Sequence, residues 1–501
     1  MGDGITDNTL AIQKALTASK HVDFGGAGNT YKVSDSVTPQ SGTYLWFNGA
    51  TVVQSTVNRQ IFNLDGLNNI SAVGGRFRGV GTDFINIGGL RSAFRGIGAT
   101  DIFIGHCYFE DFADSALTCT VSNNVYFVNN VVIGPGSPII AAGDGTCAGV
   151  LIGDNCTNIQ VTGNNISDTC QGITSGHGCI NVTISNNNIH DVPGQHGIYM
   201  GAGCVALSIV GNTIHNMNLQ GIKVQNVDTY AFYADSISIV GNSIKNTGSS
   251  GIILTNTTAS PIYLLRNISI TGNTVDTTTL DDGINLTSCL NTTVTGNILN
   301  GVKRDGIRFS NCTQLLIESN LITGSGNNGM RELLACTRVA IKGNSLYDCC
   351  TTNTVAEEQG IYILLGTDYT ITDNVIRDNL GNMRYGLQNS STNQATFMVA
   401  RNISTGATDY GARFVGTGTN LLYYADNIFS GTSGETLNAP ATNQRGNTSR
   451  IFYGTAAPAS GTWKVSDVLW NTATTAGGTP GWVCTTAGTP GTWKAMANVA
   501  V

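Results

Sequence analysis

Apolar and polar residues alternate in short, repeated segments along most of this chain. The commonest segment reads Ile-x-Ile-x-Gly-Asn-x-Ile, followed by a loop of variable length and then by Gly-Ile-x-apolar. Clear copies span 207–214, 237–244 and 268–275, and neighbouring copies lie 23 to 34 residues apart. A period of two residues predicts strands, and the repeats lack helical spacing. Repeats of this length predict a solenoid, in which each unit packs only on its neighbours.

Three short strands per repeat, separated by bends, predict an all-β fold, namely a right-handed single-stranded parallel β-helix. One Ile side chain of each strand should point inward and stack on its equivalents in the turns above and below. The Asn that follows Gly suits a bend near left-handed backbone geometry. Its amide should bond to the next Asn along the column, as in the Asn ladders of cross-β structures.

A second register supports the same repeat, because six cysteines each precede an asparagine by eight residues. They are Cys156, Cys179, Cys204, Cys289, Cys312 and Cys336. Stacked strands lie about 4.8 Å apart with parallel side-chain vectors, which is a poor match to disulfide geometry. No Cys/His spacing in the chain is typical of zinc ligands. We therefore predict buried, reduced thiols and no metal site.

The two ends of the chain differ from the repeats. We predict an N-terminal cap over residues 1–40, with a helix at 9–19 that Asp7 or Asn8 caps. The β-helix should occupy 41–430, followed by a linker at 431–450. Residues 451–501 hold four of the five Trp and look like β-hairpins joined by Gly-Pro turns. These Trp either form the core of a small module or stack on sugar rings, and we favour the core.

Composition excludes some partners. Charged residues make up 11% of the 501-residue chain and the net charge is −7, which argues against nucleic acid. No apolar run reaches the length that spans a membrane, and no signal peptide opens the sequence. Nothing in the sequence indicates a cofactor.

The strand that begins with Gly-Ile should form a long, flat groove with its outward residues. That column reads Thr174, Tyr199, Lys223, Ile253, Asn285, Arg308, Tyr362, Gln388 and Arg413, with Arg331 between Arg308 and Tyr362. Aromatic rings stack on sugar faces and guanidinium groups hold carboxylates, so the column suits a glycan. We predict that Tyr199, Lys223, Arg308, Arg331 and Tyr362 bind substrate, together with His196. An ordinary solvated sheet face is the alternative.

Carboxylates cluster beside this column. Asp281 and Asp282 enter one turn (LDDGINL), and Asp305 enters the next at the matching position (KRDGIRF). Neighbouring carboxylates push one pKa upward, which separates a general acid from a base or nucleophile. Glycoside hydrolysis needs such a pair, and side-chain rotamers reach both the retaining and the inverting separation. The alternative is turn capping, for which Asp before Gly is common.

Glu332 is expected at an inward position, where a carboxylate is costly. Its turn has one extra residue, so we predict a bulge that directs Glu332 into the groove beside Arg308. Glu358 should approach the groove from the loop one turn further on. We therefore predict Asp282, Asp305, Asp281 and Glu332 as catalytic residues and Glu358 as a substrate-binding residue.

The opening "GDGITDNTLAIQKAL" resembles pectate-lyase-superfamily β-helices in the form typical of bacteriophage tailspikes, and the tail "GTPGWVCTTAGTPGTWKA" looks like the ends of phage tail proteins. The resemblance implies a homotrimeric spike of the virion tail that binds and cleaves a bacterial surface polysaccharide. It also implies a missing N-terminal segment that attaches to the phage tail. "DDGI" resembles the Asp-Asp-Cys motif of polygalacturonases, whereas His177 of "SGHG" falls too early in the chain to match their histidine.

Three functions remain open. Endo-acting glycoside hydrolysis of capsule, O-antigen or exopolysaccharide leads, with Asp282 and Asp305 as its acid and base or nucleophile. A lyase that acts by β-elimination on a uronate would instead use Tyr199, His196 or Lys223 as base and Arg308 to neutralise the carboxylate. An adhesin would bind the glycan in the groove without cutting it.

Overall fold

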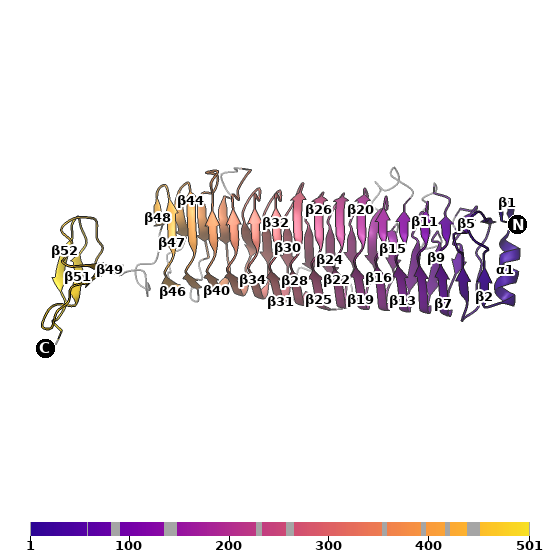
Figure 1. The fold of residues 1–501 in the computed structure, drawn as a ribbon, viewed down its shortest axis with the longest axis horizontal. Coiled ribbons are helices and arrows are strands. Elements are labelled where there is room, and N and C mark those ends of the chain that lie inside the picture. Colours follow the sequence, from indigo (N-terminus) through magenta and orange to yellow (C-terminus); the bar gives the residue numbers. More distant parts are fainter. Residues whose placement is uncertain are drawn as a thin grey trace.

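The chain winds into a right-handed parallel β-helix of three long sheets, as the repeats predict (Figure 1). The computed structural model describes residues 2–57, 59–81, 91–134, 148–226, 233–256, 265–352, 358–391, 397–415, 421–437 and 451–499. Sheet A has 17 strands, from β1 (Asp3–Asp7) to β47 (Ile428–Gly431), and sheet B has 16, from β2 (His21–Asp23) to β46 (Leu421–Ala425). Each turn of the coil, or rung, contributes one strand to each sheet.

Sheet C has 15 parallel strands and carries the column predicted to form the groove. Its strands are β6 (Phe62–Asn63), β9 (Phe94–Ile97), β12 (Leu117–Thr120), β15 (Ala148–Ile152), β18 (Gln171–Ser175), β21 (Ile198–Met200), β24 (Ile222–Asn226), β27 (Ile252–Asn256), β30 (Ile284–Thr287), β33 (Ile307–Ser310), β36 (Met330–Leu334), β39 (Gln359–Ile363), β42 (Tyr385–Asn389), β45 (Tyr410–Phe414) and β48 (Gly434–Leu437).

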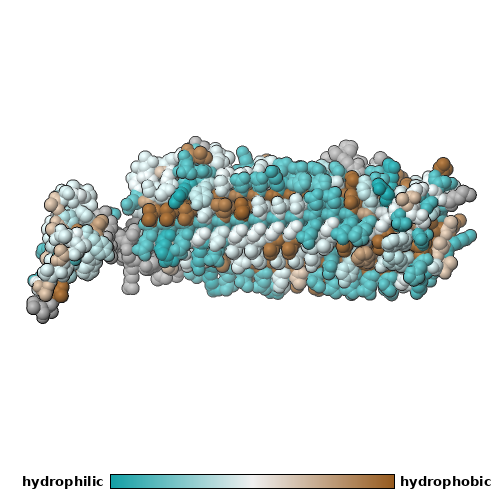
Figure 2. All heavy atoms as spheres, viewed as in Figure 1, coloured by the Kyte–Doolittle hydropathy of each residue, from teal (hydrophilic) through white to brown (hydrophobic). Residues whose placement is uncertain are grey.

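The interior is filled by stacked aliphatic side chains. In sheet B, Ile237 pairs with Ile268 and Ile239 with Ile270, and all four are buried. Each such side chain contributes about 1.5–3 kcal/mol by leaving water. The twelve cysteines of the described residues are buried and form no disulfide, which confirms the prediction for the thiols. Hydrophobic side chains reach the visible face mainly in narrow rows along the axis, between broad polar areas (Figure 2).

A buried asparagine ladder fixes the register of the rungs. From Asn130 to Asn427, each asparagine donates its backbone N–H and its side-chain N–H to the Oδ1 of the next one, as Asn242 does to Asn273 at 2.9 Å. The predicted ladder is therefore confirmed, but the predicted backbone geometry is wrong. The left-handed conformation belongs to the residue before the asparagine, such as Gly241 with φ 64°, since that residue makes the bend.

Helix α1 (Thr9–Ala18) lies at the N-terminal end of the coil (Figure 1). It buries Ile12 and Leu16 against the first rung. Asn8 is its N-cap residue but makes no side-chain cap bond, and Asp7 Oδ1 instead accepts the Thr9 N–H at 2.9 Å. Strand β1 precedes the helix and already pairs with β3 (Thr30–Val33), so the coil begins before the cap. No helix among the described residues has the length and apolar character to cross a membrane.

The C-terminal end departs from the prediction in two ways. Strand β48 still pairs with β45, so the β-helix extends to Leu437, into the predicted linker, whose residues 438–450 lie outside the described residues. The tail forms a four-stranded sheet of β49 (Ile451–Gly454), β50 (Val468–Asn471), β51 (Gly481–Thr486) and β52 (Thr492–Ala495).

Most of that tail is antiparallel, as predicted. Strands β51 and β52 are antiparallel and β50 pairs antiparallel with β51, whereas the other edge of β50 pairs in parallel with β49. Trp463 packs edge-to-face on Phe452 and on Trp493, with ring centroids 4.7 and 5.2 Å apart. These contacts favour the core role for Trp463 and Trp493, whereas Trp470 is exposed.

Candidate functional site

The outward residues of sheet C form one continuous column, named here the outer column. Strand pairing joins Thr174 to Tyr199 and then continues, rung by rung, to Arg413. Arg331 pairs with Arg308 on one side and Tyr362 on the other, as the sequence predicts. Nine steps of about 4.8 Å make the column roughly 43 Å long. It therefore offers a straight surface long enough for an extended polymer.

A second column lies beside it and consists of the residue before each Gly-Ile pair. This pre-glycine column includes Asp282, Asp305, Asn328 and Gln359, all buried. Each backbone N–H donates to the side chain of the preceding rung: Asp305 to Asp282 Oδ1 at 3.1 Å, Asn328 to Asp305 Oδ1 at 3.0 Å, and Gln359 to Asn328 Oδ1 at 3.1 Å. The turn-capping interpretation thus describes part of what these aspartates do.

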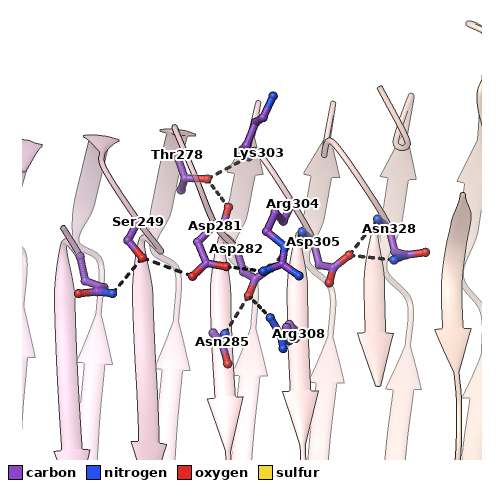
Figure 3. Close-up of polar contacts among 11 residues, drawn as sticks. Ser249, Thr278, Asp281, Asp282, Asn285, Lys303, Arg304, Asp305, Arg308 and Asn328 are labelled. Atoms are coloured by element: carbon purple, nitrogen blue, oxygen red, sulfur yellow. Dashed lines mark hydrogen bonds and ion pairs between the residues drawn. The ribbon is translucent and has the colours of Figure 1, made fainter. Parts of the chain in front are cut away.

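Capping alone does not account for the two charges. Asn328 makes the same capping bond with a neutral amide. Aspartate at two successive rungs therefore adds a repulsion between like charges that the bonds of the pre-glycine column do not require. Asp282 Oδ2 faces the outer column, where it accepts Asn285 Nδ2 at 2.8 Å and lies 3.5 Å from Arg308 Nη1 (Figure 3). Asp282 and Asp305, the pair predicted from the sequence, therefore lie on neighbouring rungs, and Asp282 contacts Asn285 and Arg308 of the outer column.

The environment of Asp282 favours the protonated carboxyl group. Burial, the charge of Asp305 and that of Asp281 raise its pKa from 3.8 to about 7, against the opposing effect of Arg308. Asp281 itself is partly exposed and accepts a bond from Arg304 Nη1 at 3.4 Å and from Ser249 Oγ at 3.3 Å. Near neutral pH the site can therefore hold an acidic proton on Asp282, directly beside the carboxyl group of Asp305.

This pKa predicts how stability depends on pH. The folded protein holds a proton on Asp282 that the unfolded chain releases near pH 4, so the free energy of unfolding should fall as pH rises from about 4 to 7. We expect a slope of up to about 1.4 kcal/mol per pH unit from this group. Denaturant titrations of the wild type and of Asp282→Asn at pH 5 and pH 8 would measure it. An identical pH dependence in both proteins would contradict the assignment.

Glu332 does not lie in the groove, and the prediction for it is wrong. Its side chain is fully buried, and its Oε2 accepts the backbone N–H groups of Leu364, Leu365 and Gly366 at 2.7–2.8 Å. Its Oε1 accepts Tyr369 Oη at 2.6 Å and the Cys336 N–H at 2.8 Å.

The predicted bulge exists but acts one residue later. Phe309 pairs with Glu332 and Ser310 with Leu334, so Leu333 is the extra residue and Glu332 keeps its inward direction. Five donors compensate the burial of its charge, which gives Glu332 a structural role. Glu358 is also buried and directly precedes Gln359 of the pre-glycine column.

A second feature of the same face is a hollow of about 500 Å³, named here the Tyr199 pocket. Tyr199, Lys223 and His196 line it, together with Asp154 and Gln225. The His196 and Tyr199 rings stack at 5.5 Å, and Lys223 Nζ lies 5.4 Å from the centre of the Tyr199 ring. The structure therefore brings together the three residues that the sequence proposed for β-elimination.

Burial changes the protonation of this trio. Desolvation and the charge of Lys223 lower the pKa of His196 to about 3, so its imidazole is neutral at neutral pH. Desolvation also lowers the pKa of Lys223 and raises that of Tyr199.

Asp154 is a pocket residue that sequence reasoning missed. Its Oδ1 accepts the His177 N–H at 2.7 Å and lies 3.1 Å from His177 Nδ1. A side chain at Gly176 would meet that oxygen, so the glycine makes room for the carboxylate. The signal was present: Asp154 precedes Cys156 by two residues, as His177 precedes Cys179, which places the two on neighbouring rungs. Among the residues that the structure describes, no cluster of His, Cys, Asp and Glu could hold a metal ion.

Known proteins share this architecture. Residues 148–350 match the family described as the right handed beta helix region. The tailspike protein of E. coli bacteriophage HK620, solved with a pentasaccharide, aligns over 87% of this chain and 78% of its own, with a TM-score of 0.54 and 13% identity. The family 28 exopolygalacturonase of Yersinia enterocolitica aligns over 68% of this chain and 76% of its own, with a TM-score of 0.53 and 14% identity.

The surface adhesin PfbA of Streptococcus pneumoniae aligns over 74% of this chain and 97% of its own, with a TM-score of 0.47 and 17% identity. No curated protein matches the sequence significantly. At these identities the likeness to the tailspike and the exopolygalacturonase establishes the fold alone, while function must be argued from the site.

Proposed function

We propose that this protein is a polysaccharide depolymerase that binds its substrate along the outer column and cleaves it by glycoside hydrolysis. The observation that carries the proposal is the pair of carboxyl groups on neighbouring rungs, of which Asp282 has a pKa of about 7. Hydrolysis of a glycosidic bond requires one carboxylic acid and one carboxylate side by side.

Asp282 is the general acid in this proposal. Its Oδ2 is covered by Asn285 and Arg308, both of which belong to the outer column and can exchange these bonds for bonds to a sugar. Displacement of Arg308 opens the carboxyl group to the glycosidic oxygen, which takes the proton as the bond breaks. As the bond breaks, Asp305 either takes a proton from the water that attacks the anomeric carbon, or attacks that carbon itself and is later released by water. Asp281 keeps the pKa of Asp282 high through its charge.

The wider setting of the proposal is a phage tailspike. It is supported by the resemblance at both ends of the sequence and by the shared architecture with a tailspike that was solved with a bound pentasaccharide. In this setting the protein acts as a homotrimer on the virion tail, outside the bacterium, and its substrate is the capsule, O-antigen or exopolysaccharide of the host.

A polysaccharide lyase is the second candidate, because the Tyr199 pocket holds a neutral imidazole, a phenol and an amine in one hollow. The products of cleavage distinguish the two reactions. Hydrolysis should release new reducing ends without ultraviolet absorbance from an unsaturated uronate, when the purified protein is incubated with polysaccharides of different encapsulated strains. Unsaturated products would instead establish β-elimination. Tight binding of a polymer that stays intact would indicate an adhesin, which binds the glycan without cutting it.

A further inference from the structure

The Tyr199 pocket has the properties of a binding site for one class of sugar. Its volume of about 500 Å³ is within the range of small-ligand sites, and its walls combine an aromatic ring with amide and charged side chains. Lys223 is in the outer column, two rungs or roughly 10 Å from Asn285. A polymer lying in the groove would therefore fill the pocket and reach the Asp282–Asp305 pair at the same time.

One buried polar atom of the pocket lacks a hydrogen bond of normal geometry. His196 is 4% exposed and its Nδ1 makes no such bond among the described residues, although the Gln220 side chain lies close enough to oppose the lowering of the His196 pKa. A buried imidazole nitrogen without a partner loses the bond that it would make in water. A hydroxyl group of a bound sugar would satisfy it.

Lys223 is the charged counterpart. Within the described residues its ammonium group forms no ion pair, and its contact is the face of the Tyr199 ring. The carboxylate of Asp154 stands on the rung of β15, three rungs away along the sheet and already bound to His177. Half-buried cations without a carboxylate partner favour an anionic ligand.

The outer column has the same sign of charge. From Thr174 to Arg413 it carries Lys223, Arg308, Arg331 and Arg413 and no acidic residue, although Arg308 pairs with Asp282 beside the column and the whole chain has a net charge of −7. A cationic strip on an anionic protein raises the association rate of an anionic polymer and favours its binding over that of a neutral one.

We infer that the Tyr199 pocket is a subsite for a sugar that bears a carboxylate group. The Lys223 ammonium pairs with the carboxylate, the Tyr199 ring packs on the sugar face, and His196 Nδ1 bonds to a hydroxyl group. The inference rests on the proposed function in one respect, since it names the class of polysaccharide that the groove takes. It holds whichever reaction follows.

Binding of acidic sugars and of their methyl esters tests this inference. The esters keep the shape and lose the charge. Titration calorimetry should show that the wild type binds at least one of glucuronate, galacturonate and N-acetylneuraminate about tenfold more tightly than its ester. Lys223→Met should remove the preference, and Tyr199→Ala should weaken acid and ester alike. Lys245→Met, on the outer face of sheet A, should change neither affinity.

The outcomes separate this inference from the proposed function. Absence of any preference in the wild type, or a preference that survives in a folded Lys223→Met protein, would overturn the subsite. Thermal unfolding at the wild-type temperature would show that the variant is folded. Asp282→Asn should keep the preference while cleavage is lost. A preference without cleavage of any polymer would defeat only the hydrolase.

Discussion

Replacing Asp282 or Asp305 by asparagine should lower the rate of polysaccharide cleavage by about 10²- to 10⁴-fold, the usual contribution of a general acid or base. Asparagine keeps the side-chain oxygen that accepts the backbone N–H of the next rung in the pre-glycine column, as Asn328 does for Gln359. The coil should therefore remain intact. The replacement removes the acidic proton of Asp282 in one variant and the carboxylate of Asp305 in the other, and the proposed reaction needs both. Initial rates of reducing-end release, measured at pH 6–7, would give the effect.

Asp276→Asn is a matched control for this pair. Asp276 lies on β29 (Thr274–Thr278) of sheet A, in the same rung as β30. Its side chain pairs with Lys245 on the surface. Its replacement should leave the rate within about twofold. If Asp282→Asn and Asp305→Asn both retained activity within a few-fold of the wild type, the pair would be a capping element and the site would lie elsewhere.

The second large effect concerns folding rather than catalysis. Glu332→Ala should lower the free energy of unfolding by about 3–5 kcal/mol, because it leaves four backbone N–H groups and the Tyr369 hydroxyl without their acceptor inside the coil. Denaturant titration would measure the loss. Tyr369→Phe removes only one of the five bonds and should cost about 1–2 kcal/mol.

The folded fraction of Glu332→Gln provides the contrasting test. It should keep the cleavage rate of the wild type, since the carboxylate reaches no groove residue. Loss of activity in a protein with unchanged stability would return Glu332 to the catalytic set.

Much of the fold could be predicted from the sequence because every rung repeats the same pattern of apolar and polar residues. The two-residue alternation gives the strands, and the eight-residue step from Cys179 to Asn187 gives the register. Register then places Asp282 beside Asp305, and Arg331 between Arg308 and Tyr362, with no further information. Local bends are harder to predict, since the left-handed residue is the neighbour of the ladder asparagine rather than the asparagine itself.

Glu332 shows where pattern reasoning fails. Alternation did assign it an inward position, but the donors that stabilise it come from the bend at residues 364–366, more than thirty residues later. That bend offers three successive N–H groups to one oxygen, an arrangement of backbone that side-chain patterns do not encode. The Tyr199 pocket was missed as a cavity for a related reason, since its walls come from residues of several rungs, from Thr120 to Gln225, whose side-chain packing the repeat pattern does not encode.

The asparagine ladder also keeps successive rungs at a constant spacing of about 4.8 Å. Lys223 lies two rungs from the rung of Asp282, and each rung is one complete turn of the coil. The distance between the two positions can therefore change only by insertion or deletion of whole rungs if the packing on either side is to be kept. Variants of this scaffold should therefore match saccharide repeat units of different length by duplicating or deleting single coils between the two positions.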